Sequence, residues 1–336
     1  MDNVALAQVW MGGNEFALRE VQLPELKADE LLVTLEAATV CGSDRHTVSG
    51  RRTAACPSIL GHEGVGRVVA SRRTGIAEGA RVVFSIMSTC GGCPRCQHGF
   101  SAKCKHVAKV GHEAFDGPWP LSGTYATHIH VLAGQTVRVI DESVPDAAAS
   151  VVCCAVATVM AVFEAAGDIE GREVLVNGVG MLGLVALAEA RRRGAGRVVG
   201  CDPAGTSFEV AEGFADTLVR SVDGIQADVV LELSGARAGV AGALGALDLG
   251  GTAVLAGSVA PAGTVDLDPE WVVRGWRTIR GVHNYEPRHL VEAVEVVTYH
   301  GLHLDWDAIC GEPIGLADLP AELAAQKSVA RRLVRF

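Results

Sequence analysis

Aromatic side chains, positive charge and long uninterrupted apolar runs are all scarce in this sequence. Aromatic residues make up 5% of the 336 residues, although 49% are hydrophobic and glycine occurs 40 times. Such a composition favours a large core of small aliphatic side chains, as in α/β proteins. The formal net charge of −10 argues against the basic face that nucleic-acid binding requires, so we expect no nucleic-acid partner.

The sequence also lacks the signals of export and of membrane insertion. No basic stretch followed by an apolar run opens the chain, so we expect no signal peptide. We take residues 174–188 as the richest apolar segment, and because three glycines interrupt it, no membrane span is predicted. We therefore expect a soluble, cytoplasmic protein, in which thiols stay reduced and clustered cysteines hold metal rather than form disulfides.

Two regions with different patterns divide the chain, in line with about two domains for this length. Up to about residue 145, short strand-like runs between glycine- and proline-rich loops are typical of an irregular β-rich domain. Beyond Pro145, alternating strands and helices predict a parallel sheet with helices on both faces. The last stretch, residues 331–336, is expected to return to the first domain as a strand.

Four cysteines are crowded into one segment, at Cys90, Cys93, Cys96 and Cys104, with two CxxC steps that share a cysteine. Four thiolates suit a tetrahedral zinc ion without an open position, which is a structural site. An iron–sulfur cluster could also use four cysteines, but the bacterial ferredoxin run ends in C-x3-C-P, which is absent here. The segment therefore predicts a zinc-bound lobe that performs no chemistry.

Two further segments carry residue types that bind zinc. Cys41 lies in VCGSDRH, and His62 lies in GHEGVGRVV with Glu63 directly after it. A thiolate and an imidazole are ligands that zinc favours, and a catalytic zinc needs about three protein ligands and one open position. The third ligand could be Cys153 or Cys154, while Glu63 could bind the metal or support its ligands. Each residue taken alone also fits a structural role.

A hydroxyl and an imidazole follow Cys41 at a helical spacing. Ser43 and His46 lie three residues apart, so on one helical turn they would share a face. Beside a metal-bound substrate they would form a proton relay. Alternatively, Ser43 begins the helix as its N-cap and His46 lies exposed on the helix surface.

A glycine-rich turn follows the strand predicted at residues 173–177. It fits the G-x-G-x-x-G pattern of dinucleotide-binding turns, in which the N-terminus of the next helix faces the phosphates. A structural turn is the alternative interpretation. The cofactor-binding residues expected here are Gly178, Gly180, Met181, Leu182 and Gly183.

An acidic residue, Asp202, ends the next predicted strand, nineteen residues after Gly183. Its carboxylate can accept hydrogen bonds from the ribose hydroxyls and would repel a 2′-phosphate. Residues 203–207 contain no arginine that could hold such a phosphate. We therefore predict NAD rather than NADP as the cofactor.

Together these motifs resemble those of zinc-containing medium-chain dehydrogenases, the alcohol dehydrogenase superfamily. The resemblance rests on VCGSD, GHEGVGRVV, the four-cysteine lobe and the unit from Gly178 to Asp202. It implies an α/β fold with a GroES-like β-rich catalytic domain and a Rossmann coenzyme domain with a doubly wound parallel sheet. The implied boundaries are 1–146 and 285–336 for the catalytic domain, about 88–106 for its zinc lobe, and 147–284 for the coenzyme domain.

The resemblance also implies which cysteine is the third catalytic ligand. In the family this ligand lies four residues before a threonine near the nicotinamide. Thr158 therefore points to Cys154 as the ligand and makes Cys153 a core residue. Glu63 would tune the metal or enter its coordination shell.

The family mechanism assigns roles to the remaining candidates. A catalytic zinc on Cys41, His62 and Cys154 would polarise the substrate alcohol, and the cysteine lobe would hold a second, structural zinc. The proton would leave through Ser43, the nicotinamide ribose and His46, while a hydride passes to NAD. The implied enzyme is a zinc- and NAD-dependent alcohol dehydrogenase with a small-molecule alcohol or carbonyl substrate.

A closer resemblance, to one subgroup of the family, bears on the substrate. The segments CGSDRHTVSGRR, PSILGHEGVGRV and RGVHNY resemble phosphonate-associated dehydrogenases, which implies a small polar or anionic metabolite such as a hydroxyalkylphosphonate. Arg51 and Arg52 could bind the anion or could be solvated loop residues. Cyclitol and polyol dehydrogenases of secondary metabolism are the alternative. A zinc-ribbon binding module and a zinc-free reductase are rival interpretations.

The family also implies an assembly. Its members associate through an edge of the Rossmann sheet, so a homodimer or homotetramer is expected. Residues 251–259 are the candidate edge.

Overall fold

The chain divides into two units, each with its own sheets and core. The computed structural model describes residues 3–300, 302–326 and 328–336. The first unit contains Met1–Ala157, Glu286–Gly301 and Cys310–Phe336, and the second contains Thr158–Tyr285 and Leu302–Ile309. The first division thus follows Ala157 rather than residue 146, because the helix that begins at Asp146 packs on strands of the first unit.

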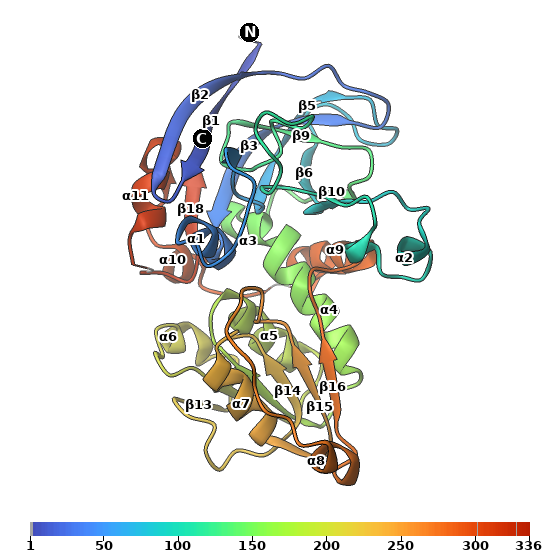
Figure 1. Ribbon diagram of the computed structural model, residues 1–336, viewed down its shortest axis with the longest axis vertical. Coiled ribbons are helices and arrows are strands. Elements are labelled where there is room, and N and C mark those ends of the chain that lie inside the picture. The colour runs from blue at the N-terminus through green and yellow to red at the C-terminus, as the bar shows by residue number, and fades with distance from the viewer. Residues whose placement is uncertain (1–2, 301, 327) are drawn as a thin grey trace. The chain divides into compact units, whose positions relative to one another are not determined.

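A seven-stranded sheet forms the centre of the first unit. Strand β3 (Leu31–Val40) is its hub and pairs antiparallel with β5 (Gly64–Ser71), β9 (His128–Val131) and β18 (Arg332–Arg335). β18 comes from the far end of the chain and lies beside β3 in Figure 1. The other members of the sheet are β6 (Arg81–Phe84), β10 (Val137–Val139) and β17 (Ile314–Gly315).

The sheet is stable because β3 is apolar with a period of two residues. Leu31, Val33 and Leu35 fall on one face, where they share a core with Phe84 and Ile129. Each of these side chains is at most 2% exposed. Burying one such side chain contributes roughly 1.5–3 kcal/mol, so this cluster holds the strands in register.

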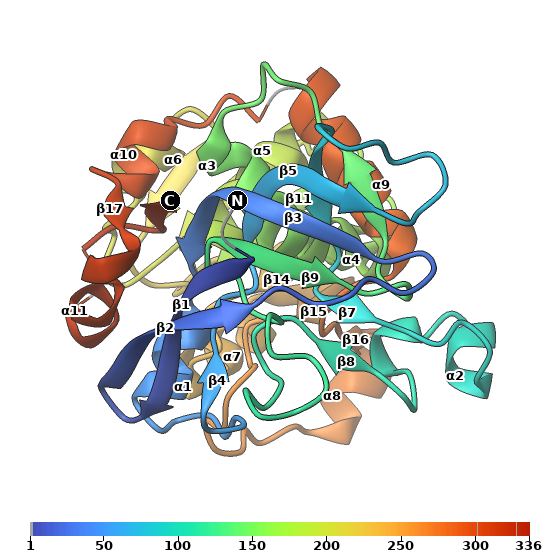
Figure 2. The same cartoon turned by 90° about the horizontal axis from the view of Figure 1, so that it is seen from above.

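Two smaller sheets complete the strands of the first unit. β1 (Val4–Gly12) lies between β2 (Glu15–Gln22) and β4 (Ser58–Ile59), and Figure 2 shows β2 alongside β1. β7 (Met87–Ser88) and β8 (Ala108–Lys109) pair antiparallel on either side of the cysteine lobe. β4 ends shortly before His62, and this pairing therefore positions a candidate ligand.

The helices of the first unit are short. They are α1 (Gly42–Val48), α2 (Pro94–Gln97), η1 (Ser101–Lys103), α3 (Asp146–Val151), the π-helix η2 (Val152–Val156), α9 (Pro287–Glu295), the π-helix η3 (Val296–His300), η4 (Leu316–Asp318) and α11 (Leu319–Ala324). One more helix, α10 (Trp306–Cys310), crosses the division between the units.

One long apolar helix contains no glycine, unlike residues 174–188, which were considered above as a possible membrane span. α3, η2 and α4 (Ala157–Ala166) run on from one another to form the stretch Asp146–Ala166. Of the part of the chain that the structure describes, this helix alone is long and apolar enough to span a membrane, with a mean hydropathy of 2.0. Because 83% of that window is buried within the protein, the helix is a core helix.

The second unit contains a six-stranded sheet in which every pair is parallel. The α/β fold class is confirmed by this sheet. In spatial order its strands are β13 (Thr217–Val219), β12 (Arg197–Cys201), β11 (Glu173–Asn177), β14 (Ala227–Glu232), β15 (Leu247–Leu255) and β16 (Thr278–Gly281).

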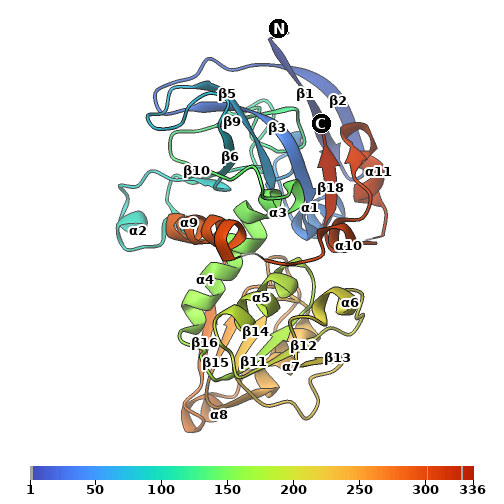
Figure 3. The ribbon, with the colours of Figure 1, turned by 180° about the vertical axis from the view of Figure 1, so that it is seen from behind.

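The strand order reverses between β11 and β14. Helix α5 (Met181–Arg192) packs on β11 and β12, whereas α7 (Arg237–Gly245) packs on β14 and β15. The two helices cover opposite faces, as Figures 1 and 3 show. Ligands of such sheets bind outside the carboxyl ends of the strands at this reversal. The short helices α6 (Phe208–Ala211) and α8 (Pro269–Arg274) complete the unit.

The predicted sheet edge at residues 251–259 is wrong. Most of that segment belongs to β15, which pairs with β14 on one side and β16 on the other. β16, which follows α8 in the chain, pairs with the outer side of β15. β13 and β16 are therefore the outer strands of this sheet.

Candidate metal centres and coenzyme-binding turn

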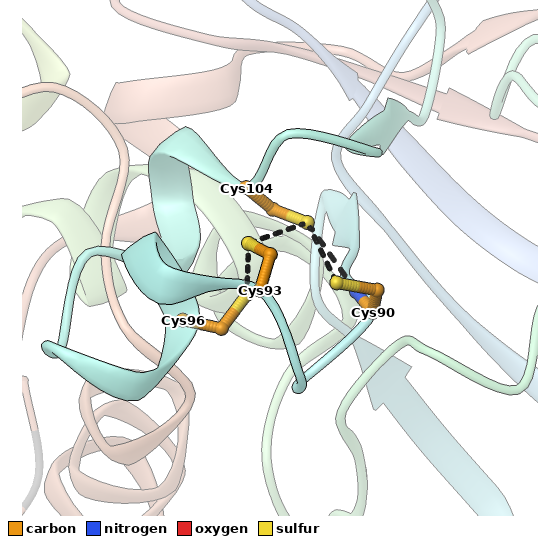
Figure 4. A group of neighbouring side chains, drawn as sticks. All are labelled: Cys90, Cys93, Cys96 and Cys104. Carbon is orange, nitrogen blue, oxygen red and sulfur yellow. Dashed lines mark hydrogen bonds between the residues drawn. The ribbon is translucent and has the colours of Figure 1, made fainter.

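The four cysteines of the lobe converge on one point (Figure 4), with all sulfur atoms within 4.8 Å of one another. The separations are 3.5 Å for Cys93–Cys96, 3.9 Å for Cys93–Cys104 and 3.5 Å for Cys90–Cys104. A tetrahedral zinc ion at about 2.3 Å from each sulfur would separate the sulfurs by roughly 3.8 Å. The cluster therefore fits a closed, structural zinc site.

The backbone of the lobe prepares the sulfurs for a metal. Gly91 and Gly99 have φ angles of 67° and 78°, which let the chain turn tightly around the cluster. Backbone N–H groups of Lys105 and Cys96 lower the pKa of Cys93 to about 6. A thiolate is thus favoured at the position where a metal ligand must be deprotonated.

A carboxylate from a distant part of the chain anchors the lobe. Glu286, the N-cap residue of α9, accepts hydrogen bonds from the backbone N–H groups of Ser101 and Ala102, each at 3.0 Å. The Ser101 hydroxyl donates to the same carboxylate. These contacts satisfy the free N–H groups at the start of η1. No local pattern in the sequence signals this long-range cap.

The second group of candidate ligands also comes together. One ligand atom each from Cys41, His62, Glu63 and Cys154 lies within 4.8 Å of the others. Cys41 is the N-cap residue of α1, and His62 and Glu63 lie in the loop before β5. Three separate segments of the first unit therefore supply the donors, and the set of two thiols and an imidazole suits zinc.

The π-helix η2 separates the two adjacent cysteines. Cys153 is fully buried and contacts backbone atoms of the β5 region, with its sulfur 3.4 Å from Gly64 N and 3.6 Å from His62 O. Cys154 joins the donor cluster instead. A π-turn inserts one residue into a helix and is frequent at functional sites. Here it directs one thiol to the core and the next thiol to the candidate centre.

Asp44 orients the imidazole of the candidate centre. Its carboxylate is 3.3 Å from His62 Nδ1, and it accepts hydrogen bonds from Tyr125 Oη at 2.8 Å and Cys41 N at 3.1 Å. Burial works to lower the pKa of His62, but Asp44 and Cys41 raise that pKa well above its usual value. The negative surroundings favour a cation, and His62 Nε2 remains available to bind it.

A buried ion pair lies beside the thiolate. Glu63 is 0% exposed, and its Oε2 accepts from Arg331 Nε at 3.0 Å and from Thr39 Oγ1 at 2.6 Å. Arg331 Nη2 is also 3.4 Å from Cys41 Sγ. A hydrogen bond from the Cys154 thiol, aided by the charge of Arg331, lowers the pKa of Cys41 well below its usual range. Arg331 has no signal in the sequence other than being a basic residue before the last strand.

The candidate relay residues both lie on α1. Ser43 Oγ is 3.4 Å from His62 Nε2 and therefore lies next to the candidate metal position. His46 is partly exposed one turn later, where burial and the charges of Arg51 and Arg52 lower its pKa. The helix thus places a hydroxyl at the centre and an imidazole near solvent.

The glycine turn of the second unit has a geometry that requires glycine at two positions. Gly178 has a φ of 101°, and a Cβ there would lie 2.6 Å from Ser234 N. A Cβ on Gly183 would lie 2.1 Å from Gly178 O, so only glycine permits this packing of helix on strand. Gly180 is the N-cap residue of α5, whose first residues are Met181 and Leu182.

The aspartate after β12 ties two loops together. Asp202 Oδ2 accepts from Val179 N at 3.0 Å, and Oδ1 accepts from Ala204 N at 2.9 Å and Gly205 N at 3.2 Å. Although residues 203–207 contain no arginine, Arg220 reaches this loop and donates to the carbonyl of Ala204 at 2.7 Å. Arg220 could not be recognised from the sequence, because it lies thirteen residues beyond the segment 203–207. Thr158 lies in α4, at the start of the second unit.

Comparison with known proteins identifies the family. Residues 27–141 match the alcohol dehydrogenase GroES-like domain. The zinc-type alcohol dehydrogenase-like protein YphC of Escherichia coli is 30% identical over 266 residues, which cover 70% of this chain and 71% of that protein. The chain belongs to the zinc-type alcohol dehydrogenases of the medium-chain superfamily.

Further relatives of this zinc-type dehydrogenase agree. Alcohol dehydrogenase B of Mycobacterium tuberculosis is 32% identical over 216 residues, but the match spans only 59% of this chain and 57% of that protein. A solved zinc-binding dehydrogenase from Sinorhizobium meliloti 1021, bound to NADP, is 25% identical with a TM-score of 0.88, and 99% of each chain is covered. The GroES-like and Rossmann architecture is thus shared across the whole chain.

Proposed function

We propose that this chain is a zinc- and NAD-dependent alcohol dehydrogenase that transfers a hydride between an alcohol, or its aldehyde or ketone, and the nicotinamide. One arrangement carries the proposal. Cys41, His62 and Cys154 meet in the catalytic unit, and Ser43 Oγ lies beside them. Three such ligands leave one position of a tetrahedral zinc for the substrate oxygen.

The residues of the centre bind the metal and move a proton. Zinc held there would supply a Lewis acid that brings the pKa of an alcohol toward neutrality. Ser43 Oγ, 3.4 Å from His62 Nε2, would accept the proton of the alcohol and give up its own hydroxyl proton. His46, near solvent on the same helix, would release that proton from the protein.

Glu63 supports this centre rather than acting as a permanent ligand. Arg331 and Thr39 already hold its carboxylate, although one of its oxygens lies within the donor cluster. Because burial raises the pKa of Glu63, Arg331 is needed to oppose that effect and keep it ionised. Asp44 in turn fixes the ring of His62.

The cofactor is proposed to be NAD. The carboxylate of Asp202 lies between the glycine turn and the loop after β12, where the ribose of a dinucleotide binds in this fold. Gly178, Gly180 and Gly183, with Met181 and Leu182, form the phosphate-binding turn. Thr158 would lie near the nicotinamide.

The substrate is proposed to be a small polar or anionic hydroxylated metabolite such as a hydroxyalkylphosphonate. Arg51 and Arg52 support an anion, since they follow the helix that carries Ser43. A cyclitol or polyol is the second candidate, as the resemblance of the motifs to this family implies. A cytoplasmic homodimer or homotetramer without membrane or nucleic-acid partners completes the proposal.

A screen of NAD reduction tests the proposed function. The zinc-loaded protein is assayed with hydroxyalkylphosphonates, cyclitols, polyols and simple alcohols, and zinc is counted by mass spectrometry. Turnover of one class with about two zinc ions per chain is the expected result. A zinc-free reductase would bind at most the lobe metal, and absence of turnover with every class would contradict the proposal.

A further inference from the structure

Two basic side chains of the first unit have no acid to balance them. The side chains of Arg52 and Lys109 make no hydrogen bond or ion pair with any residue that the structure describes. Other arginines of this unit are paired: Arg67 binds Glu142, and Arg81 binds Asp146. An unpaired cation on an open surface is ordinary, so its surroundings decide whether it has a role.

Lys109 lies on a turn that packs against the ligand loop of the candidate catalytic centre. The chain turns after Lys109 through Gly111, whose φ is 74°. A Cβ on Gly111 would lie 2.4 Å from Gly61 O, so this turn touches the residue directly before His62. The ring of His112 completes the contact, with its centroid 5.9 Å from that of His62.

Arg52 reaches the same place from α1. Its backbone N–H donates to the carbonyl of His46 at 3.0 Å, so the chain folds back along the helix after the turn at Gly50. Its charge acts on two groups around the centre: after the larger effect of burial, it helps Arg51 to lower the pKa of His46 and helps Lys103 to lower the pKa of Lys109. The charge of Arg52 therefore acts both on α1 and on the turn that carries Lys109.

The cations repel each other at partly buried positions. Burial, followed by the charges of Lys103 and Arg52, lowers the pKa of Lys109 to about 8. The acid nearest in sequence, Glu113, accepts the backbone N–H of Lys109 at 2.8 Å and not its ammonium group. Like charges held together without a counter-ion favour the binding of an anion.

His112 adds a hydrogen-bond acceptor to this group. Its Nδ1 is 2.7 Å from Val110 O and must donate the proton of that bond, because a carbonyl only accepts. Its Nε2 is buried and has no partner among the described residues. A buried acceptor left alone is costly, and a ligand hydroxyl would satisfy it.

We propose that Arg52 and Lys109 form an oxyanion-binding subsite for the substrate, with His112 Nε2 accepting a hydrogen bond from a hydroxyl of the same molecule. The inference rests on the proposed function, because it assumes the dehydrogenase reaction. It restricts the substrate to small hydroxylated phosphonates, phosphate esters or carboxylates. The planar fork of Arg52 suits two oxygens of such a group, and Lys109 supplies a second charge. A neutral polyol would leave both charges unmatched.

Binding of an inert oxyanion tests the subsite without turnover. Methylphosphonate is titrated calorimetrically into the zinc-loaded protein with saturating NADH, and methyl phosphate and acetate show which oxyanion fits. Arg52→Leu and Lys109→Gln are each expected to weaken binding about tenfold or more, as for the loss of a charged hydrogen bond. Arg138→Leu is the matched control, because Arg138 lies exposed on β10, outside the cluster. Unchanged zinc content and circular dichroism show that each variant folds.

Two results would overturn the subsite. Equal weakening in Arg138→Leu and Arg52→Leu would show that only net charge matters. Loss of methylphosphonate binding when NADH is added would show that the cations serve the phosphates of the coenzyme instead.

The pH dependence gives a second, independent measurement. Sulfate stays doubly charged over the range, so its affinity follows the charge of the protein. Because Lys109 is protonated below its pKa of about 8, affinity is expected to be highest below that pH and to fall as the pH rises through it. Lys109→Gln should remove this decline. A wild-type profile that is flat between pH 7 and 9 would exclude Lys109 from the subsite.

The outcomes separate the subsite from the proposed function. Turnover of neutral alcohols without any oxyanion binding would support the dehydrogenase activity and contradict the subsite. Methylphosphonate binding without turnover of any alcohol would support the subsite and contradict the dehydrogenase activity.

Discussion

Arg331 and Glu63 are 268 positions apart in the sequence, yet Arg331 Nε lies 3.0 Å from Glu63 Oε2. Their side chains are 4% and 0% exposed. A buried carboxylate beside a thiolate would repel it, and the guanidinium lies close to both, since Arg331 Nη2 is 3.4 Å from Cys41 Sγ. The charge balance of the candidate centre therefore depends on one residue near the last strand.

Removal of this arginine should be strongly destabilising. Arg331→Met leaves Glu63 buried without a counter-ion, and breaking such a pair costs about 3–5 kcal/mol. Urea unfolding measures the loss. The double variant with Glu63→Gln should recover much of it, because the unpaired charge is then gone. A loss below about 1 kcal/mol in the single variant would mean that the pair is solvated like a surface pair.

The two adjacent cysteines should respond differently to replacement by serine. Cys154→Ser is expected to lose the catalytic zinc and turnover, and to keep the lobe zinc, the fold and most NADH affinity. Cys153→Ser, its matched control, should keep both metals and lose stability, because the thiol is fully buried against Gly64. Zinc analysis and calorimetry distinguish the two. Full activity in Cys154→Ser would show that another residue is the third ligand.

Glu286 should stabilise the cysteine lobe from a distance. Glu286→Gln removes the charge that receives two N–H groups and a hydroxyl, and a hydrogen bond to a charged group contributes about 1.5–3 kcal/mol. The lobe should then release zinc faster to a chelator and be cleaved sooner by protease. Glu295→Gln, exposed on the same helix, is the control. Equal zinc release in both variants would exclude a specific anchor.

Asp202 and Arg220 should set the preference between NAD and NADP in opposite directions. Asp202→Ala removes the carboxylate that repels a 2′-phosphate, so the ratio of NADP to NAD affinity should rise about tenfold or more. Arg220→Leu should lower that ratio, since the guanidinium lies at the loop after β12. Fluorescence titration with both reduced cofactors measures the ratio. An unchanged ratio in Asp202→Ala would contradict the ribose assignment.

The parts of the site that lie in short segments could be predicted from the sequence. The cysteine lobe and the glycine turn need neighbouring residues at fixed spacing, so their chemistry is visible as motifs. The parallel sheet and the β-rich domain could be predicted because the pattern of apolar residues changes near Pro145. The choice between Cys153 and Cys154 did not follow from spacing alone, because it depends on a π-turn that local propensity does not reveal.

The parts that the sequence concealed depend on long-range contacts. Arg331 and Glu286 reach their partners only after distant segments have folded together, and neither lies in a recognisable motif. The sheet edge was misplaced because β16 is a short strand that follows an irregular segment and the short helix α8. The stretch Asp146–Ala166 was not weighed as a membrane span, because its small residues at helical spacing resemble those of any core segment.

The position of β18 has a consequence for biosynthesis. A ribosome releases Cys41, His62 and Cys154 well before Arg331, so the donor atoms exist for a time without the guanidinium that neutralises Glu63. Until β18 pairs with β3, Glu63 lacks the counter-ion that it has in the folded chain. The charge-balanced arrangement of the candidate centre is therefore complete only after the last strand of the chain has paired with β3.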